Sequence, residues 1–251
     1  IVFLAKNKLG YENLMKMCSI GYTEGFYYVP RIDKDLVKKY KEGLIVLSGS
    51  KYGEISNKII NVGEKQALDA CLWWKEIFMN DFYLEMNIHG EEENEIINEQ
   101  LLKFSKNHDI KVIATNDTKY ISREDANAHD ILLCVKDGQQ QSTPIGRGRG
   151  FRYGLKNQEY YFKTKDEMIK LFKKYPDAIG NISELVEKVD FYDLSREVLL
   201  PKFSIPENFN STSNDIENEY LKHLVYEGAS EKYQNINDGL KEKIDFELEV
   251  I

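Results

Sequence analysis

The residues best placed to do chemistry follow the apolar, β-branched run Lys111–Asn116. A run of this kind that stops abruptly in polar residues is typical of a buried strand in a parallel sheet. Ligands and metals usually bind at the carboxyl-terminal edge of such a sheet. The carboxylate of Asp117 is therefore a candidate metal ligand. Asp at a strand end is also a common turn or capping residue, and position alone leaves both interpretations open.

The stretch Gln139–Gly154 supplies a second set of candidates. Its arginine and aromatic residues are Arg147, Arg149, Phe151, Arg152 and Tyr153. Flexible glycine–arginine stretches with interleaved aromatic residues can follow a phosphate backbone, so the three arginines are candidate nucleic-acid-binding residues. A solvated loop, or a loop that docks on another part of a larger protein, explains the same composition equally well.

The histidines and cysteines carry weaker signals. His89 and His129 each stand alone, and we expect structural roles for both. Cys18, Cys71 and Cys134 have no metal-binding spacing. Cys18 and Cys71 fall in helical patterns, where a buried free thiol is the commoner role, and this usage predicts a reducing, cytoplasmic compartment.

Composition limits the class of protein. The chain has 251 residues, of which 42% are hydrophobic and 30% charged, and its net charge is −8. Such a chain can fill a core but is not a generic nucleic-acid binder. No apolar run reaches the roughly 18 residues that span a bilayer, and no signal peptide is visible, so we expect no membrane partner.

The elements that must position these residues alternate along the chain. The expected strands are Ile1–Ala5, Gly43–Ser50, Phe82–Ile88 and Lys111–Asn116, with a short one at Tyr160–Lys163. The expected helices are Tyr11–Gly25, Asp33–Tyr40, Gly53–Ile60, Glu64–Phe78, Glu91–Lys106, Ser122–Val135, Lys165–Lys174, Pro176–Val189, Ile216–Tyr233 and Asp238–Ile251. Alternating strands and helices with short connections predict an α/β layer or barrel rather than a sandwich.

The chain divides at a polar linker near Pro201–Asn214. It begins inside a strand pattern at Ile1 and runs to Ile251 in a helical pattern without a stop signal. We therefore expect a fragment of a longer polypeptide.

Several stretches in collinear order resemble the bacterial DNA polymerase III alpha subunits, the C-family replicative polymerases. They are Gly10–Lys16, Tyr22–Asp33, Glu42–Gly49, Asp81–Glu85 with His89 and Gly90, Ala114–Tyr120, Asp125–Val135, Leu199–Phe203 and Ile244–Ile251. The resemblance implies a PHP-type (β/α) barrel over residues 1–200, truncated at its amino terminus. Residues 201–251 would be a linker and the first helices of the polymerase core.

The resemblance also implies which chemistry to expect. The parent would be a DNA-directed DNA polymerase that uses magnesium, but its polymerase active site lies outside these residues. Metal-binding relatives carry His, Cys and Asp-x-His where this chain has Ile20, Ser50 and Asp117-Thr-Lys119. Of these four ligand positions only Asp117 is retained, and it could instead pair with Lys119 or another cation.

The resemblance therefore favours a metal-free scaffold that offers a docking surface for a proofreading exonuclease subunit. DNA and other replicase subunits would be partners through the parent. The alternative is a metal-dependent 3′–5′ exonuclease or phosphoesterase, which would require zinc or manganese in an intact site.

Overall fold

The computed structural model describes residues 1–146, 148–195, 203–209 and 215–251. The chain forms two compact units, Ile1–Leu194 and Ser195–Ile251. Of the expected linker Pro201–Asn214, only residues 203–209 are among the described residues. In the described part of the chain, no helix is both long and apolar enough to cross a membrane.

The first unit is built on a four-stranded sheet in the order β1-β2-β3-β4. Its strands are β1 (Val2–Ala5), β2 (Leu44–Leu47), β3 (Phe82–Met86) and β4 (Val112–Ala114). The strands β2, β3 and β4 run parallel, as the sequence predicts, but β1 is antiparallel to β2. Val2 pairs with Leu47, so the start of the chain lies at the carboxyl edge of the parallel strands. Within the described residues the sheet is open and not a closed barrel.

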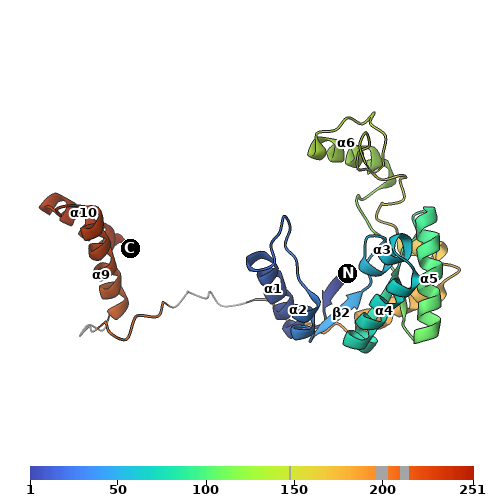
Figure 1. The fold of residues 1–251 in the computed structure, drawn as a ribbon, viewed down its shortest axis with the longest axis horizontal. Helices are drawn as coiled ribbons and strands as arrows, with labels where there is room; N and C mark the ends of the chain where they lie inside the picture. The colour runs from blue at the N-terminus through green and yellow to red at the C-terminus, as the bar shows by residue number, and fades with distance from the viewer. Residues whose placement is uncertain (147, 196–202, 210–214) are drawn as a thin grey trace. The chain divides into compact units, whose positions relative to one another are not determined.

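The described residues include ten α-helices, most of which are labelled in Figure 1. They are α1 (Lys8–Thr23), α2 (Lys34–Lys39), α3 (Glu54–Asn61), α4 (Glu64–Phe78), α5 (Glu92–His108), α6 (Ala126–Asp137), α7 (Lys165–Leu171), α8 (Pro176–Glu187), α9 (Ile216–Lys232) and α10 (Asp238–Val250). All ten expected helices are confirmed, because apolar periodicity and capping residues mark them. Asp33 caps α2, and Ser122 with Asp125 forms a capping box before α6.

Both faces of the sheet are buried. Along β3, Phe82, Leu84 and Met86 pack into the larger core with α4 and α5, whereas Tyr83 packs on the opposite face near Leu185 of α8. All five residues of β3 are buried, although polar residues alternate with apolar ones in Glu85–Ile88. A parallel strand covered on both faces has this property.

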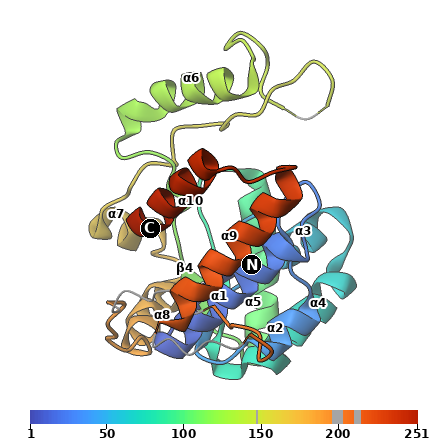
Figure 2. The same ribbon diagram turned by 90° about the vertical axis from the view of Figure 1, so that its left-hand side faces the viewer.

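Helix α6 lies apart from the helices that cover the sheet in both views (Figures 1 and 2). A short η2 turn (Arg123–Asp125) leads into it, and Arg152, which follows it in the chain, pairs with Asp130 of the helix. In the second unit, Tyr226 of α9 donates a hydrogen bond of 2.7 Å to Asp245 of α10.

Two expectations are wrong. The segment at Tyr160–Lys163 is not a strand. Tyr161 forms only an isolated bridge with Tyr120, and the pairing does not extend to the residues on either side. Cys18 is exposed rather than buried, because the buried face of α1 runs through Met17 and Cys18 is rotated away from it. Cys71 is buried as expected, and burial raises the pKa of its thiol to about 12.

Replacing Leu84 by Ala tests the packing of β3. Leu84 is fully buried in the larger core, so Leu84→Ala should lower the free energy of unfolding by about 2–5 kcal/mol. The same substitution at the exposed Leu132 of α6 should change it by less than about 0.5 kcal/mol. Urea unfolding followed by tryptophan fluorescence reports this difference, since Trp74 packs in the same core. Equal effects at the two positions would contradict the fold.

Candidate functional site at the carboxyl edge of the sheet

Polar side chains from three neighbouring strands meet where the parallel strands end. The backbone N–H of Glu85 donates to Ser48 Oγ at 2.8 Å. The hydroxyl of Thr115 donates to Glu85 Oε1 at 2.6 Å and accepts from Asn87 Nδ2 at 2.7 Å. These residues follow or end β2, β3 and β4, so the common edge of the sheet brings them together.

Glu85 is the carboxylate at this edge that the sequence analysis missed. It is buried, and burial raises the pKa of its carboxyl while hydrogen bonds from Thr115 and Asn87 lower it, with a net rise. Its second oxygen, Oε2, has no hydrogen-bond partner among the described residues. The available signal was a lone carboxylate inside an apolar strand, which is rare unless the group is paired or functional.

Asp117, the metal-ligand candidate from the sequence, forms an ion pair with Lys119, two residues further along the chain. Its Oδ1 lies 2.7 Å from Lys119 Nζ, so the pairing considered from the sequence is confirmed. Lys119 is fixed in turn, because its backbone N–H donates to the carbonyl of Tyr160 at 2.8 Å. Asn116 points elsewhere and donates to the carbonyl of Tyr161 at 2.7 Å. The residues that follow β4 are therefore hydrogen-bonded to the segment around Tyr160.

A buried ionic group lies next to this edge. Lys51 Nζ is 2.6 Å from Glu91 Oε2, and the hydroxyl of Tyr160 donates to Glu91 Oε1 at 2.5 Å. Burial alone would raise the pKa of the Glu91 carboxyl, but the hydrogen bonds from Lys51 and Tyr160 hold it below its usual range. The sequence analysis did not find this group, because its three members come from separate segments with no shared motif.

His89 packs flat against Tyr160. The two ring centroids are 4.2 Å apart, the planes are inclined by 5°, and the His89 side chain is buried. Its Nε2 has no hydrogen-bond partner among the described residues. Burial, followed by the positive charge of Lys163, lowers the pKa of His89 to about 4. The imidazole is therefore neutral at pH 7 and is held by stacking.

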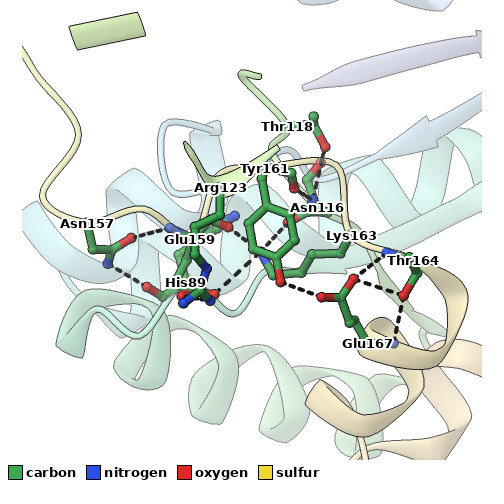
Figure 3. A network of polar contacts seen from close by, with 10 residues as sticks. All are labelled: His89, Asn116, Thr118, Arg123, Asn157, Glu159, Tyr161, Lys163, Thr164 and Glu167. Carbon is green, nitrogen blue, oxygen red and sulfur yellow. Dashed lines mark hydrogen bonds and ion pairs between the residues drawn. The ribbon is translucent and has the colours of Figure 1, made fainter. Parts of the chain in front are cut away.

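Figure 3 shows how the segment that carries Tyr160 is fastened. Asn157 donates to the carbonyl of His89 at 2.7 Å. The buried Lys163 ammonium donates to Asn116 Oδ1 at 3.3 Å and to the carbonyl of Glu159. Arg123 pairs with Glu159 at 2.5 Å. These bonds fix the segment against the ends of β3 and β4.

The three candidate arginines separate in the structure. Arg147 lies outside the described residues, and Arg149 is exposed. Arg152 is buried and forms a two-pronged ion pair with Asp130 of α6, at 2.6 and 2.9 Å. Its remaining donors reach the carbonyls of Thr143, Gln141 and Tyr153. Because all of its N–H groups are used, Arg152 holds the loop and has none left for a phosphate.

The donor set at the edge does not suit a metal cluster. In the described part of the chain no three His, Cys, Asp or Glu side chains converge. Asp117 is already neutralised by Lys119, and an ammonium group repels a cation. Ile20 lines a separate cavity of about 440 Å³ with Arg31 and Leu36. His129 instead packs against Tyr120, with the two ring centroids 5.4 Å apart.

Glu91→Gln tests the buried ionic group. Removing the charge leaves the Lys51 ammonium, whose side chain is 14% exposed, without its partner. The free energy of unfolding should fall by about 3–5 kcal/mol. Glu93 makes a much more exposed contact with Lys156 at 3.8 Å, and Glu93→Gln should cost less than about 1 kcal/mol. Urea unfolding curves of both variants make the comparison, and equal losses would contradict the assignment.

The pH dependence of stability tests His89. Its pKa is about 4 in the folded chain against 6.5 for a free side chain, so the unfolded chain binds more protons between these values. Stability should therefore fall as the pH drops below 6.5, by about 2 kcal/mol from this residue between pH 7 and 5. His89→Phe keeps the stacking and should flatten this slope, whereas His223→Phe on the exposed α9 should not. Identical pH profiles for both variants would refute the role.

Comparison with known proteins relates this chain to bacterial replication proteins. The PHP domain family matches residues 1–89. The DNA polymerase III subunit alpha of Borreliella burgdorferi is 40% identical, and that of Treponema pallidum is 31% identical, each over 252 residues. The Helicobacter pylori protein of the same name is 35% identical over 277 residues. All three alignments cover 100% of this chain but only 21–22% of the relative, so the chain spans about a fifth of their length. The chain is therefore a homologue of one part of the DNA polymerase III alpha subunits, and its residues 1–89 match the PHP domain.

Proposed function

We propose that this chain is a non-catalytic, metal-free structural region of a DNA-directed DNA polymerase. The observation that carries the proposal is the ion pair between Asp117 and Lys119, 2.7 Å apart at the carboxyl edge of the sheet. At that edge a protein ammonium neutralises the carboxylate that a metal would otherwise use. Lys51 does the same for Glu91 at 2.6 Å.

This arrangement supports a structural role because it supplies stability without a bound ion. A buried carboxylate must be paired, hydrogen-bonded or metal-bound. Here lysines and hydroxyl groups meet that requirement, and the same bonds join the ends of the strands to the segment around Tyr160. Zinc or manganese would have to displace Lys119 from Asp117 and would find Ser50, a poor ligand, in place of a thiolate.

A metal-dependent 3′–5′ exonuclease or phosphoesterase remains the alternative function. Such chemistry needs several His, Asp or Cys ligands to polarise a phosphate and generate hydroxide. Magnesium belongs, in this proposal, to the polymerase active site of the whole subunit.

The proposal extends to fold and partners. The open four-stranded sheet would be part of a PHP-type barrel, with residues 1–200 as the PHP region and 201–251 as a linker and first helices of the polymerase core. The partners would be DNA, other replicase subunits and a proofreading exonuclease subunit docked on the PHP region. The subunit would work in the cytoplasm.

Metal content in the whole alpha subunit tests the proposal. After dialysis against zinc or manganese, elemental analysis should find no metal bound to this region, and the region should show no nuclease activity on single-stranded DNA. Lys119→His removes the competing ammonium and adds an imidazole, so it should increase metal uptake. Lys156→His, at an exposed lysine, is the matched control and should not. Stoichiometric metal together with nuclease activity in the unaltered protein would overturn the proposal.

A further inference from the structure

The segment between α1 and α2 exposes a cluster of large side chains. We call residues 24–33 the aromatic loop, which projects beyond the end of α1 (Figure 1). Consecutive side chains of the loop are more than half exposed, namely Phe26, Tyr27, Tyr28 and Val29. Tyr22, in the last turn of α1, is also exposed and stacks on Phe26 with the ring centroids 6.3 Å apart. Contiguous exposed apolar surface of this kind marks an interaction site, whereas single exposed apolar residues are normal.

The aromatic loop is held in one conformation by its own backbone. The N–H of Arg31 donates to the carbonyl of Gly25 at 3.2 Å, and the N–H of Tyr27 donates to the carbonyl of Val29 at 3.1 Å. Tyr28, at the tip, has a φ of 61°, which a bulky residue adopts only where the surrounding structure imposes it. A surface that is already ordered loses little conformational entropy on binding.

A cavity of about 440 Å³ adjoins the loop. Its apolar lining comes from Ile20, Ile32 and Leu36. Arg31 lines it as well, and the guanidinium of this residue lies 4.8 Å from the centroid of the Tyr27 ring. The cavity and the exposed rings therefore form one continuous surface.

Three carboxylates line this cavity. Glu24 forms no ion pair within the part of the chain that the structure describes. Asp33 uses only Oδ1 to cap α2, at 2.8 Å from the N–H of Leu36. Asp35 is 3.9 Å from Lys38, and its side chain is 92% exposed. All three carboxylates can therefore meet a cation from outside.

Two cations, Arg31 and Lys39, line the cavity too. Each lies against a tyrosine ring, Arg31 on Tyr27 and Lys39 at 5.3 Å from the centroid of Tyr40. A ring face attracts a cation and so favours these positions. With three carboxylates against two cations the lining carries a net charge of −1, and its unengaged charge is negative. The surface therefore complements a partner that is both apolar and basic.

We propose that the aromatic loop and its cavity bind a proline-rich, extended segment of a protein partner, with a basic side chain of that segment beside Glu24. Proline-rich segments dock on grooves lined by aromatic side chains, and a polyproline II helix is already extended before it binds. The exposed rings supply the packing surface, and the carboxylates fix the direction in which the segment runs.

The charge of the lining disfavours two other ligands. A nucleic acid would bring its phosphates up to three carboxylates, which repel them. A membrane surface of anionic lipids would be repelled in the same way. The inference goes beyond the structural role proposed above, because it assigns a partner chemistry to a surface that this role does not use. It also does not depend on whether the edge of the sheet binds metal.

Fluorescence anisotropy with a labelled oligoproline peptide that ends in an arginine pair tests the aromatic loop. The whole chain is titrated into the peptide. Tyr28→Gly removes the exposed ring and suits the left-handed backbone, so it should weaken binding about fivefold or more. Tyr22→Ala should weaken binding similarly, whereas Tyr22→Phe keeps the ring and should bind as the unaltered chain does. Tyr233→Ala, at an exposed tyrosine outside the loop, is the matched control and should have no effect.

Salt dependence tests the carboxylates. Glu24→Gln should weaken binding of the same peptide about two- to fivefold at low salt. The difference should shrink as added salt screens the charge. Glu231→Gln, at an exposed position of α9, is the matched control and should leave the affinity unchanged.

A peptide of the same length and the same arginine end, with glycine and serine in place of proline, should bind more weakly. Equal binding of this peptide, or equal affinity of the Tyr28→Gly and Tyr233→Ala variants, would overturn the proposal. Self-association that Tyr28→Gly abolishes would assign the surface to a second copy of the chain instead. An absence of peptide binding by a chain whose thermal unfolding and circular dichroism are normal would also refute it.

Discussion

The need to pair buried charge at the carboxyl edge of the sheet governs this region of the molecule. Glu91 is almost fully buried, and it is tolerated only because Lys51 and Tyr160 supply a cation and a hydroxyl donor. Tyr160 in turn stacks on His89 and accepts the backbone N–H of Lys119. One carboxylate thus joins the ends of three strands to a segment some seventy residues further along the chain. That pairing adds to the bonds that Asn116 and Asn157 make between the ends of the strands and the same segment.

The same groups separate the structural role from the catalytic one. Hydrolytic metal sites keep carboxylates and imidazoles available as ligands and leave an open position for substrate. Here the Asp117 carboxylate is neutralised by Lys119, and the His89 imidazole lies flat on a tyrosine ring. The edge has the location of an active site in an α/β protein, but the carboxylates of Asp117 and Glu91 are paired with lysines of the same chain. This electrostatic pattern supports the structural role proposed above.

Sequence periodicity was a sound guide to the elements and a poor one to the site. The helix Glu64–Phe78 and its neighbours follow directly from apolar spacing and from caps such as Asp33, because these signals are local. The Lys51–Glu91–Tyr160 group and the pairing of Arg152 with Asp130 depend on contacts across many residues. Composition indicates that an arginine is present but not whether it points inward. The sequence does not reveal that β1 runs antiparallel to β2, because the apolar pattern of one strand does not identify the strand with which it pairs.

The way in which Arg152 holds its loop has a consequence for variation. Apart from Asp130, every partner of its guanidinium is a main-chain carbonyl, at Thr143, Gln141 and Tyr153. Carbonyl groups are present whatever the side chain. The outward-facing positions 149, 151 and 153 can therefore exchange their side chains while the backbone keeps its path. The exposed side chains of such a loop can differ between homologues, and with them the surface that the loop presents, while the backbone conformation stays the same.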